Sequence, residues 1–240
     1  MSVPAGKGAR SMGAAPGMLS VKPEMILVDL DGTMVDSVPD LALCVDIMMR
    51  HLGLPERGEA RVREWIGNGV ERLVKRALVG AYEGEPEEAL FRKALPVFLE
   101  AYEKNVCVGS RPYPGVEAGL KFLSDAGYPL GCVTNKAARF TEPLLEKLGL
   151  AKFFGIIVSG DTLPVKKPDP APLLHAAEFF RVAPEKSLLI GDSISDVKAA
   201  RAAGFEVVCV SYGYNHGMDI REAGPDVVID SMEQMRMVLP

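Results

Sequence analysis

Short apolar segments alternate with helix-forming segments along most of this chain, and that alternation restricts the possible folds more than any other feature. The expected strands are Met25–Asp29, Pro129–Val133, Gly155–Val158, Ser187–Gly191, Glu206–Val210 and Val227–Ile229. The expected helices are Val116–Ala126, Ala137–Leu148, Ala171–Phe180 and Ile194–Ala203. Such alternation is typical of a parallel sheet covered by helices on both faces. We therefore predict an α/β fold with a Rossmann-like core of three layers.

One interval, from Ser37 to about Arg111, contains no convincing strand. It begins with a candidate N-cap, since Ser37 is followed three positions later by Asp40. The expected helices run from there to His51, and then over Glu59–Ile66, Val70–Leu78 and Pro86–Lys104, the last kinked at Pro96. The interval therefore predicts a helical cap subdomain inserted after the first strand.

We expect the chain to divide into three parts. Residues 1–20, rich in Gly, Ala, Ser and Pro, form a disordered leader. Residues 21–36 and 112–240 form the α/β core, and residues 37–111 form the helical cap. Right-handed crossovers place the carboxyl ends of parallel strands on one edge of the sheet, where ligands bind. An insert at that edge is well placed to act as a lid.

Composition and charge exclude several classes of protein. The 240 residues are 48% hydrophobic and carry a net charge of −5, which provides no attraction for nucleic acid or an anionic membrane. No apolar run reaches the roughly 18 residues of a membrane span. The four cysteines lie far apart with no CxxC pair, which argues against a zinc site or disulfide framework and suits a cytoplasmic protein. The sequence does not indicate an oligomeric state.

Two carboxylates stand at the end of the first expected strand: Asp29 is its last residue and Asp31 lies two positions further on, so the two face the same way if the extended form persists. Side chains two positions apart on an extended strand face the same way. Two like charges this close at the end of a buried strand are unfavourable unless a proton or a cation lies between them. A hard divalent cation with oxygen ligands, such as Mg²⁺, would resolve this conflict. The alternative is that one aspartate caps a turn and the other is solvated.

Polar side chains also stand at the ends of the later strands. They are Thr134 and Asn135 after the second strand, Lys167 between prolines after the third, and Asp192 and Asp196 after the fourth. Each one alone could be a helix cap or a solvated loop residue. Their recurrence at consecutive strand ends favours a phosphoryl-transfer site, in which carboxylates hold a cation while hydroxyl, amide and ammonium groups bind a phosphate. The chain lacks the GxxxxGK[ST] motif of a P-loop nucleotide site.

The stretches DLDGT, TN, KP and GDSISD, in this order and spacing, resemble the four motifs of the haloacid dehalogenase superfamily. The resemblance extends from Met25 to Pro240 and includes a helical cap between the first and second motifs. Within the superfamily, DLDGTMVDSVPDL, WIGNGVERLVKRAL and VTNKAARFTEPLLEKLGL are similar to the bacterial phosphoglycolate phosphatases. The stretch SYGYNHG, residues 211–217, adds to that similarity, but its residue types predict no chemical role.

That resemblance implies a hydrolase that acts on a small phosphorylated metabolite. Among such metabolites, it favours 2-phosphoglycolate as the substrate. It implies that Asp29 attacks phosphorus and becomes an aspartyl phosphate, which divides one displacement into two easier steps. Asp31 would protonate the leaving oxygen and then deprotonate the hydrolytic water. The dehalogenase branch of the superfamily lacks this second aspartate.

The resemblance also implies a Mg²⁺ ion and a set of groups that bind the phosphate. The Asp29 carboxylate, the Asp31 main-chain carbonyl and Asp192 would hold the metal, with Asp196 behind them. The phosphate would be bound by Thr134, Asn135 and Lys167, and Lys167 would also steady Asp29. Gly191, which precedes Asp192, departs from capped relatives that carry an acidic residue there and removes one possible metal ligand.

Selectivity among phosphomonoesters must come from the cap. Gly67, Asn68 and Gly69 lie between two expected helices, where backbone N–H groups could bind a substrate carboxylate. Three residues of the next helix could add positive charge, namely Arg72, Lys75 and Arg76. A plain turn and a solvated helix face would explain the same residues. Other capped enzymes of the superfamily remain alternatives (a sugar-phosphate phosphatase, a mutase or a pyrophosphatase), as does a phosphoryl-accepting signalling domain.

Overall fold

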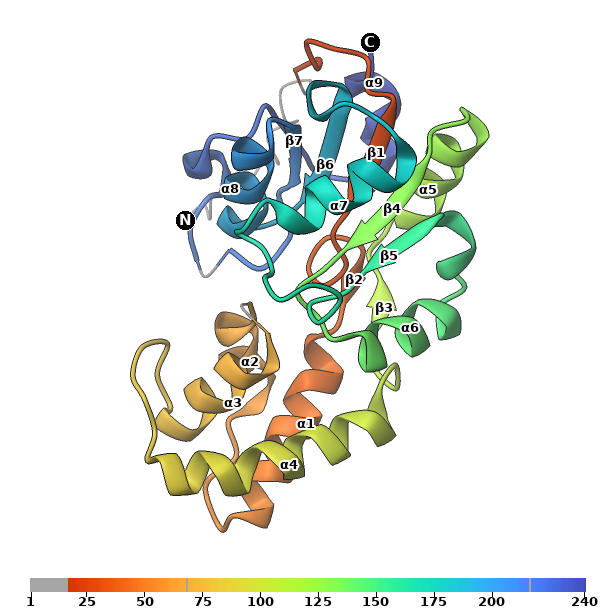
Figure 1. The fold of residues 1–240 in the computed structure, drawn as a ribbon. Coiled ribbons are helices and arrows are strands. Elements are labelled where there is room, and N and C mark those ends of the chain that lie inside the picture. The colour runs from red at the N-terminus through yellow and green to blue at the C-terminus, as the bar shows by residue number, and fades with distance from the viewer. Residues whose placement is uncertain (1–16, 68, 216) are drawn as a thin grey trace, which may run out of the picture.

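Six parallel strands form the central sheet of the computed structural model, which describes residues 17–67, 69–215 and 217–240 (Figure 1). The strands are β1 (Met25–Val28), β4 (Leu130–Val133), β5 (Ile156–Val158), β6 (Ser187–Gly191), β7 (Glu206–Val210) and β8 (Val227–Ile229). Their order across the sheet is β5-β4-β1-β6-β7-β8. All six predicted strands are confirmed, and β1 lies in the middle of the sheet, between β4 and β6.

Helices cover the sheet on both faces, as predicted. They are α5 (Val116–Asp125), α6 (Ala138–Lys147), α7 (Ala171–Phe180), α8 (Ile194–Ala203) and α9 (Met235–Val238). Short 3₁₀ turns occur at Ala151–Phe153, Pro184–Lys186, Ile220–Ala223 and Met232–Gln234. Figure 1 shows α7 and α8 in front of the sheet and α5 behind it.

The central strand is buried on both of its faces. Met25 and Leu27 pack in one apolar cluster with α7 and α8, while Ile26 and Val28 pack in the other with α5 and α9. All four side chains are fully buried. This double burial is the reason that the sequence shows a continuous apolar run here rather than an alternating one.

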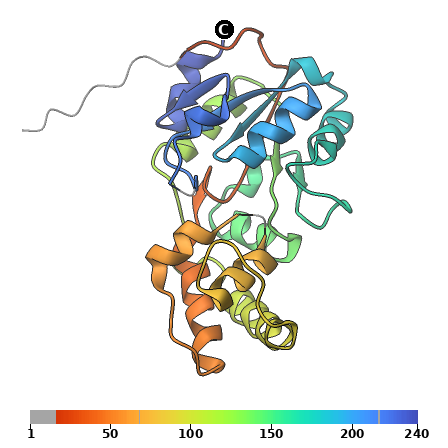
Figure 2. The ribbon, with the colours of Figure 1, turned by 90° about the vertical axis from the view of Figure 1, so that its left-hand side faces the viewer.

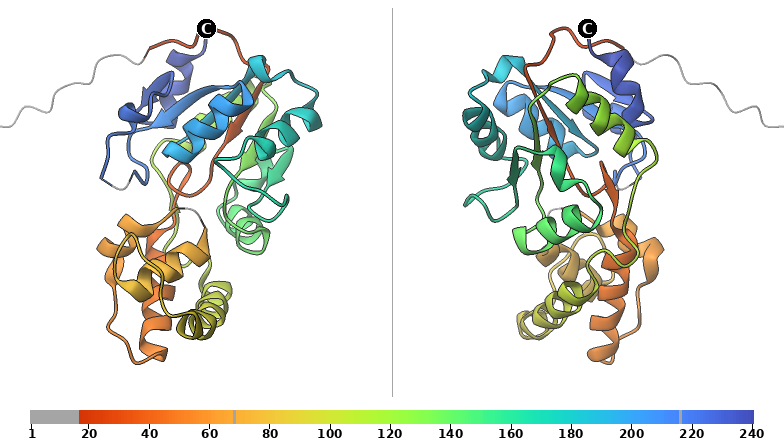
Figure 3. Two further views of the ribbon diagram at one scale, coloured as in Figure 1. Left: turned by 60° about the vertical axis from the view of Figure 1, so that its left-hand side comes forward. Right: turned by 90° about the vertical axis from the view of Figure 1, so that its right-hand side faces the viewer.

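Four helices form a separate layer beyond the carboxyl edge of the sheet, which we call the cap (Figures 2 and 3). They are α1 (Val38–His51), α2 (Gly58–Trp65), α3 (Val70–Val79) and α4 (Glu88–Asn105). The predicted helices agree with these bounds to within two residues, and Pro96 lies inside α4. Within the described ranges, no helix combines the length and the hydrophobicity that crossing a bilayer requires.

A two-stranded ribbon joins the cap to the core. Strand β2 (Val35–Asp36) pairs antiparallel with β3 (Arg111–Pro112), so the chain leaves the core and returns to it side by side. The sequence analysis missed both strands, because two residues are too few to show an alternating pattern. Both connections to the cap therefore pass through a single narrow point.

Ser37 is the N-cap residue of α1, as predicted, but the expected capping contact with Asp40 does not form. The Ser37 side chain makes no capping hydrogen bond, and its buried hydroxyl finds no partner among the described residues. The Asp40 carboxylate instead accepts hydrogen bonds from the N–H groups of residues 108–110 and from the Ser110 hydroxyl. Asp40 therefore fixes the segment that returns from the cap, because those distant donors are brought to it by the tertiary fold.

We expect Asp40→Ala to lower the free energy of unfolding by about 2–4 kcal/mol, because three backbone N–H groups lose their acceptor. Urea denaturation monitored by circular dichroism measures this loss. Asp125→Ala, which removes an exposed carboxylate paired only with Lys121 on α5, is the matched control and should change stability by less than about 0.5 kcal/mol. Equal effects of the two substitutions would contradict the role given to Asp40.

Candidate active site

A cavity of about 710 Å³ lies between the carboxyl edge of the sheet and the cap. Nine of the site residues predicted from the sequence line this cavity, whereas Asn68 lies outside the described residues and the three predicted cap cations do not line it. The nine are, from the core, Asp29, Asp31, Thr134, Asn135, Lys167, Asp192 and Asp196, and from the cap, Gly67 and Gly69. The topology thus brings together residues that are up to 167 positions apart, from Asp29 to Asp196.

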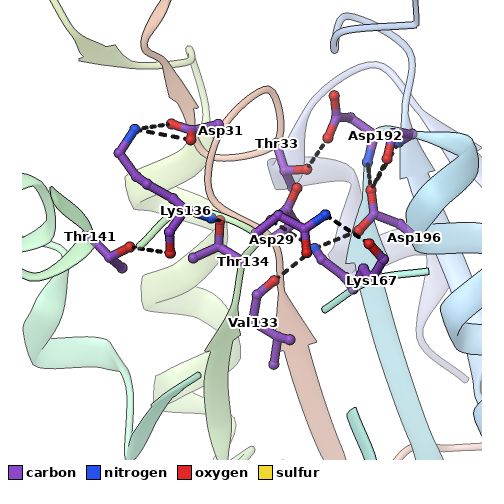
Figure 4. A network of polar contacts seen from close by, with 12 residues as sticks. Asp29, Asp31, Thr33, Val133, Thr134, Lys136, Thr141, Lys167, Asp192 and Asp196 are labelled. Atoms are coloured by element: carbon purple, nitrogen blue, oxygen red, sulfur yellow. Dashed lines mark hydrogen bonds and ion pairs between the residues drawn. The ribbon is translucent and has the colours of Figure 1, made fainter. Parts of the chain in front are cut away.

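Lys167 is a buried cation that lines the cavity, and Figure 4 shows it beside Asp29 and Asp196. Its ammonium nitrogen lies 2.8 Å from Asp29 Oδ1 in an ion pair, and it donates hydrogen bonds to Asp196 Oδ1 at 2.7 Å and to the Val133 carbonyl at 2.8 Å. Three acceptors thus surround the buried ammonium. Lys167 therefore holds Asp29 in a fixed position at the end of β1.

Asp196 is held as firmly as Lys167. One carboxylate oxygen pairs with Lys167, and the other accepts hydrogen bonds from the N–H groups of Asp192 and Ser193 and from the Ser193 hydroxyl. Asp196 is fully buried at the third position of α8, where a carboxylate can satisfy free N–H groups at the helix start. Its two oxygens thus tie the start of α8 to the Lys167 loop.

Asp192 is supported from two sides. Its Oδ1 accepts a hydrogen bond from the Thr33 hydroxyl at 2.9 Å, and its Oδ2 accepts one from the Tyr214 N–H at 2.7 Å. Gly32 and Gly213 make this close packing possible, because a Cβ atom at either position would lie within 2.5 Å of an Asp192 atom. The sequence analysis assigned no role to Thr33, although it is the last residue of the DLDGT motif.

Three buried carboxylates, those of Asp29, Asp192 and Asp196, have oxygens that all lie within 4.8 Å of one another. Burial raises the pKa of Asp29 to about 6, with Lys167 opposing the shift and Asp196 adding to it. Burial, with the charges of Asp196 and Asp29, also raises the pKa of Asp192 well above its usual range. One lysine thus compensates only part of the negative charge of this cluster.

This arrangement suits a divalent cation. Mg²⁺ prefers oxygen ligands and carboxylates in particular, and the cluster offers them in a buried place with excess negative charge. Asp192 is also fixed in advance by its two hydrogen bonds, so it would lose little freedom on binding a metal. The residues present therefore fit the ion that the sequence predicted.

Asp31 points away from this cluster, so it does not face the same way as Asp29, which was expected only if the extended backbone continued past Asp29 (Figure 4). Strand β1 ends at Val28, so the extended backbone does not persist to Asp31. The Asp31 carboxylate instead pairs through both oxygens with Lys136, at 3.0 Å each. The carboxylate of Asp31 is therefore not part of the acidic cluster, and a main-chain role in metal binding stays a prediction.

Lys136 is a second buried cation that the sequence analysis overlooked. Its side chain is 3% exposed, and its ammonium lies 4.9 Å from the ring centre of Tyr102 on α4. Burial acts to lower the pKa of Lys136, but the charge of Asp31 and the contact with Tyr102 outweigh it and raise the pKa. The signal was present in the sequence, because Lys136 directly follows Thr134 and Asn135.

Thr134 and Asn135 lie where the sequence placed them, at the carboxyl end of β4. The Thr134 hydroxyl accepts a hydrogen bond from the Lys136 N–H at 3.2 Å. The Asn135 amide donates to the Lys167 carbonyl at 2.9 Å, and its oxygen is buried without a hydrogen-bond partner among the described residues. These contacts connect the second motif to the third and leave polar groups at the cavity wall.

The two tyrosines of the SYGYNHG stretch contact the ribbon that leads to the cap. Tyr212 donates its hydroxyl hydrogen bond to the Thr33 carbonyl. The Tyr214 hydroxyl donates to Asp36 at 2.8 Å and accepts from the Ser37 N–H at 3.0 Å. Because the Tyr214 N–H also holds Asp192, this stretch links the acidic cluster to the base of the cap.

The three cap cations suggested by the sequence do not reach the cavity. Arg72 and Lys75 pair with Glu85 on the cap surface, and Arg72 also pairs with Glu83. Arg76 is buried and donates to the carbonyls of Trp65, Gly67 and Tyr82, so it braces the loop before α3. Helix periodicity alone could not distinguish these pairs from a face that points to the site. The cation that the described part of the cap contributes to the cavity lining is Arg61, on α2.

The sequence profile of the haloacid dehalogenase-like hydrolases matches residues 26–210. The chain belongs to this family. It is 64% identical to a protein named phosphoglycolate phosphatase from Nitrosococcus oceani, over 91% of this chain and 97% of that protein. A protein of the same name from Nitrosospira multiformis is 49% identical over 86% of this chain and 91% of that protein.

Solved structures agree with this assignment. The crystal structure of a predicted phosphoglycolate phosphatase from Haemophilus somnus superposes with a TM-score of 0.85 and 37% identity, over 91% of this chain and 98% of that one. The α/β core with its cap, derived above from the strand and helix pattern, is thus the family fold. The protein is an enzyme of this family, a hydrolase of the phosphatase type.

The raised pKa of Asp29 predicts that metal-free protein loses stability as the pH rises. Its pKa is 3.8 without the fold and about 6 within it, so the folded state is favoured while Asp29 is protonated, and this advantage is lost between pH 4 and 6. We expect Asp29→Asn to raise the free energy of unfolding by about 2–3 kcal/mol at pH 8 in EDTA, and by much less at pH 4. Urea denaturation at both pH values measures the difference. A variant no more stable than the wild type at pH 8 would contradict the burial effect.

Proposed function

We propose that this protein is a Mg²⁺-dependent phosphomonoester hydrolase that converts 2-phosphoglycolate to glycolate and phosphate. The observation that carries the proposal is the position of Asp29 at the floor of the cavity, paired with Lys167 and close to two further carboxylates. The choice of substrate is supported by relatives up to 64% identical that are named phosphoglycolate phosphatase. A small phosphorylated metabolite also suits a cavity of about 710 Å³ between the core and the cap.

The metal would be held by the carboxylates of Asp29 and Asp192 and by the main-chain carbonyl of Asp31. When bound there, Mg²⁺ cancels negative charge that would otherwise repel an anionic ester from an anionic nucleophile. Asp196 and Lys167 would hold these ligands in place rather than bind the metal, since each is hydrogen-bonded to the other and to the backbone. The substrate phosphate would be bound by Thr134, Asn135 and Lys167.

In the first step, a carboxylate oxygen of Asp29 attacks phosphorus, and the bond from phosphorus to the glycolate oxygen breaks. Asp31 gives a proton to that oxygen, so glycolate leaves as an alcohol rather than an alkoxide. The product on the protein is an aspartyl phosphate at Asp29. Lys167 orients Asp29 for this attack, because it fixes one of the two oxygens.

In the second step, water attacks the phosphorus of the aspartyl phosphate and the bond to Asp29 breaks. Asp31 removes a proton from the water and so returns to its starting form. Free phosphate leaves, and the sum of the two steps is the consumption of one ester and one water. Separating the reaction in this way replaces one difficult displacement with two easier ones.

The cap would select the substrate. Gly67 and Gly69 line the cavity opposite the acidic cluster, so backbone N–H groups of this loop could bind a substrate carboxylate. Asn68 completes the proposed loop but lies outside the described residues. The division of the chain into a core (residues 21–36 and 112–240) and a cap (residues 37–111) stays a prediction, as does a cytoplasmic location.

Metal binding should stabilise the protein without any substrate. At a Mg²⁺ concentration about 100 times its dissociation constant, we expect the free energy of unfolding to rise by about 2.7 kcal/mol, which corresponds to roughly 5–10 °C in Tm. Differential scanning fluorimetry with Mg²⁺ or EDTA measures this shift. Asp192→Asn should remove most of it, whereas Asp125→Asn on the exposed face of α5 should not. A full shift in Asp192→Asn would contradict the assignment of Asp192 as a ligand.

Phosphate release from a panel of small phosphomonoesters tests the activity. We expect the highest kcat/KM with 2-phosphoglycolate, loss of activity in EDTA, and a decrease of at least about 1000-fold in Asp29→Asn. A higher kcat/KM with a sugar phosphate would support the proposed phosphomonoester hydrolysis but contradict the choice of 2-phosphoglycolate as the substrate. Turnover of no ester, together with a long-lived aspartyl phosphate after treatment with a small phosphoryl donor, would indicate a signalling domain instead.

A further inference from the structure

The Lys136–Asp31 pair conflicts with the role that Asp31 has in the proposed reaction. Both carboxylate oxygens of Asp31 lie 3.0 Å from the Lys136 ammonium, with side chains 19% and 3% exposed (Figure 4). Both oxygens face Lys136 and point away from Asp29, whereas the leaving oxygen is bonded to the phosphorus that Asp29 attacks. We therefore expect the pair to open when Asp31 turns to the leaving oxygen.

Opening the pair leaves a buried ammonium that needs another anion. An unpaired buried charge is strongly unfavourable, so the separation of Lys136 from Asp31 requires a replacement partner. The ring of Tyr102, 4.9 Å from the ammonium, supports Lys136 on the cap side but is not an anion. The replacement has to come from the cavity, which Lys136 lines.

The substrate proposed above carries such an anion in a suitable place. In 2-phosphoglycolate, a single CH₂ group separates the carboxylate from the ester oxygen that Asp31 must reach. A cation beside Asp31 can therefore bind the carboxylate together with the N–H groups proposed for the loop at Gly67 and Gly69, and Lys136 is in contact with Asp31. Arg61 also lines the cavity, but it is exposed and makes no described contact with Asp31.

The other buried cation of the cavity already has a role in the proposed reaction. Lys167 contacts Asp29, Asp196 and the Val133 carbonyl, and it would bind the phosphate rather than the carboxylate of the substrate. Of the two buried lysines that line the described cavity, Lys136 is therefore the one that can change its partner during the reaction.

We propose that Lys136 exchanges partners when substrate binds, releasing Asp31 and pairing with the carboxylate of the substrate. This inference rests on the proposed function and extends it: Lys136 determines specificity by touching the substrate, and it controls when Asp31 becomes available. An ester without an anion one carbon from its ester oxygen leaves Asp31 bound to Lys136. Recognition of the substrate and release of the acid are then one event.

The test compares 2-phosphoglycolate with ethyl phosphate, in which a methyl group replaces the carboxylate. We expect Lys136→Met to lower kcat/KM for 2-phosphoglycolate by about 10- to 100-fold, the value of a buried charge-assisted contact. For ethyl phosphate, kcat/KM should stay within 3-fold of wild type or rise, because Asp31 is no longer held. A merely structural role for Lys136 would lower both values equally, and that result would overturn the proposal.

Binding measured without turnover provides a second readout. In an Asp29→Asn background, isothermal titration calorimetry should show tighter binding of 2-phosphoglycolate than of ethyl phosphate. Adding Lys136→Met should reduce the affinity for 2-phosphoglycolate by about 10- to 100-fold and leave that for ethyl phosphate unchanged. A preference that survives Lys136→Met would overturn the exchange and leave the proposed function intact. A wild-type enzyme with no preference for 2-phosphoglycolate would overturn both.

Two further variants control for folding and charge. Lys136→Arg keeps the positive charge, and we expect it to retain most of the preference for 2-phosphoglycolate even if Lys136→Met folds poorly. Complete loss of the preference in a folded Lys136→Arg protein would count against the exchange. Lys121→Met removes an exposed lysine on α5, paired with Asp125, and should leave both substrates unaffected.

Discussion

The burial of three carboxylates around one lysine is the constraint on which the rest of this structure depends. Asp29, Asp192 and Asp196 would repel one another in a site with little water, and Lys167 offsets only part of that repulsion. The surrounding fold holds them nonetheless. Glycines at positions 32 and 213 give Asp192 room, and the start of α8 supplies N–H groups to Asp196. The negative charge that remains uncompensated favours the binding of a cation at this site.

The cap depends on the same constraint through the ribbon at its base. The Tyr214 N–H holds Asp192, while its hydroxyl binds Asp36 and the first N–H of the cap connection. Asp36 in turn pairs with Arg63 on α2 through two hydrogen bonds. A continuous series of polar contacts therefore runs from the acidic cluster to the cap. The position of the helices that close the cavity is thus physically connected to the residues that carry the chemistry.

The fold could be predicted almost completely from the sequence, because its signals are local. Strand β1 shows a continuous apolar run because both of its faces are buried. Glycines mark the ends of core helices, as Gly204 does at the end of α8. The two-residue strands of the ribbon were missed, since they carry no periodicity. Ser37 is the N-cap residue as predicted, but its capping contact with Asp40 does not form, because the Asp40 carboxylate accepts hydrogen bonds from residues 108–110 instead.

For the site, the sequence determined which residues gather at the cavity, because parallel strands place their carboxyl ends on one edge and the motifs follow those ends. It did not determine how the charges pair. Only the tertiary structure decided that Asp31 turns to Lys136, that Arg76 braces a loop, and that Tyr214 joins the acidic cluster to the cap. Ion pairs and hydrogen bonds depend on distances of a few ångströms between segments far apart in the chain, and residue spacing along the chain does not contain those distances.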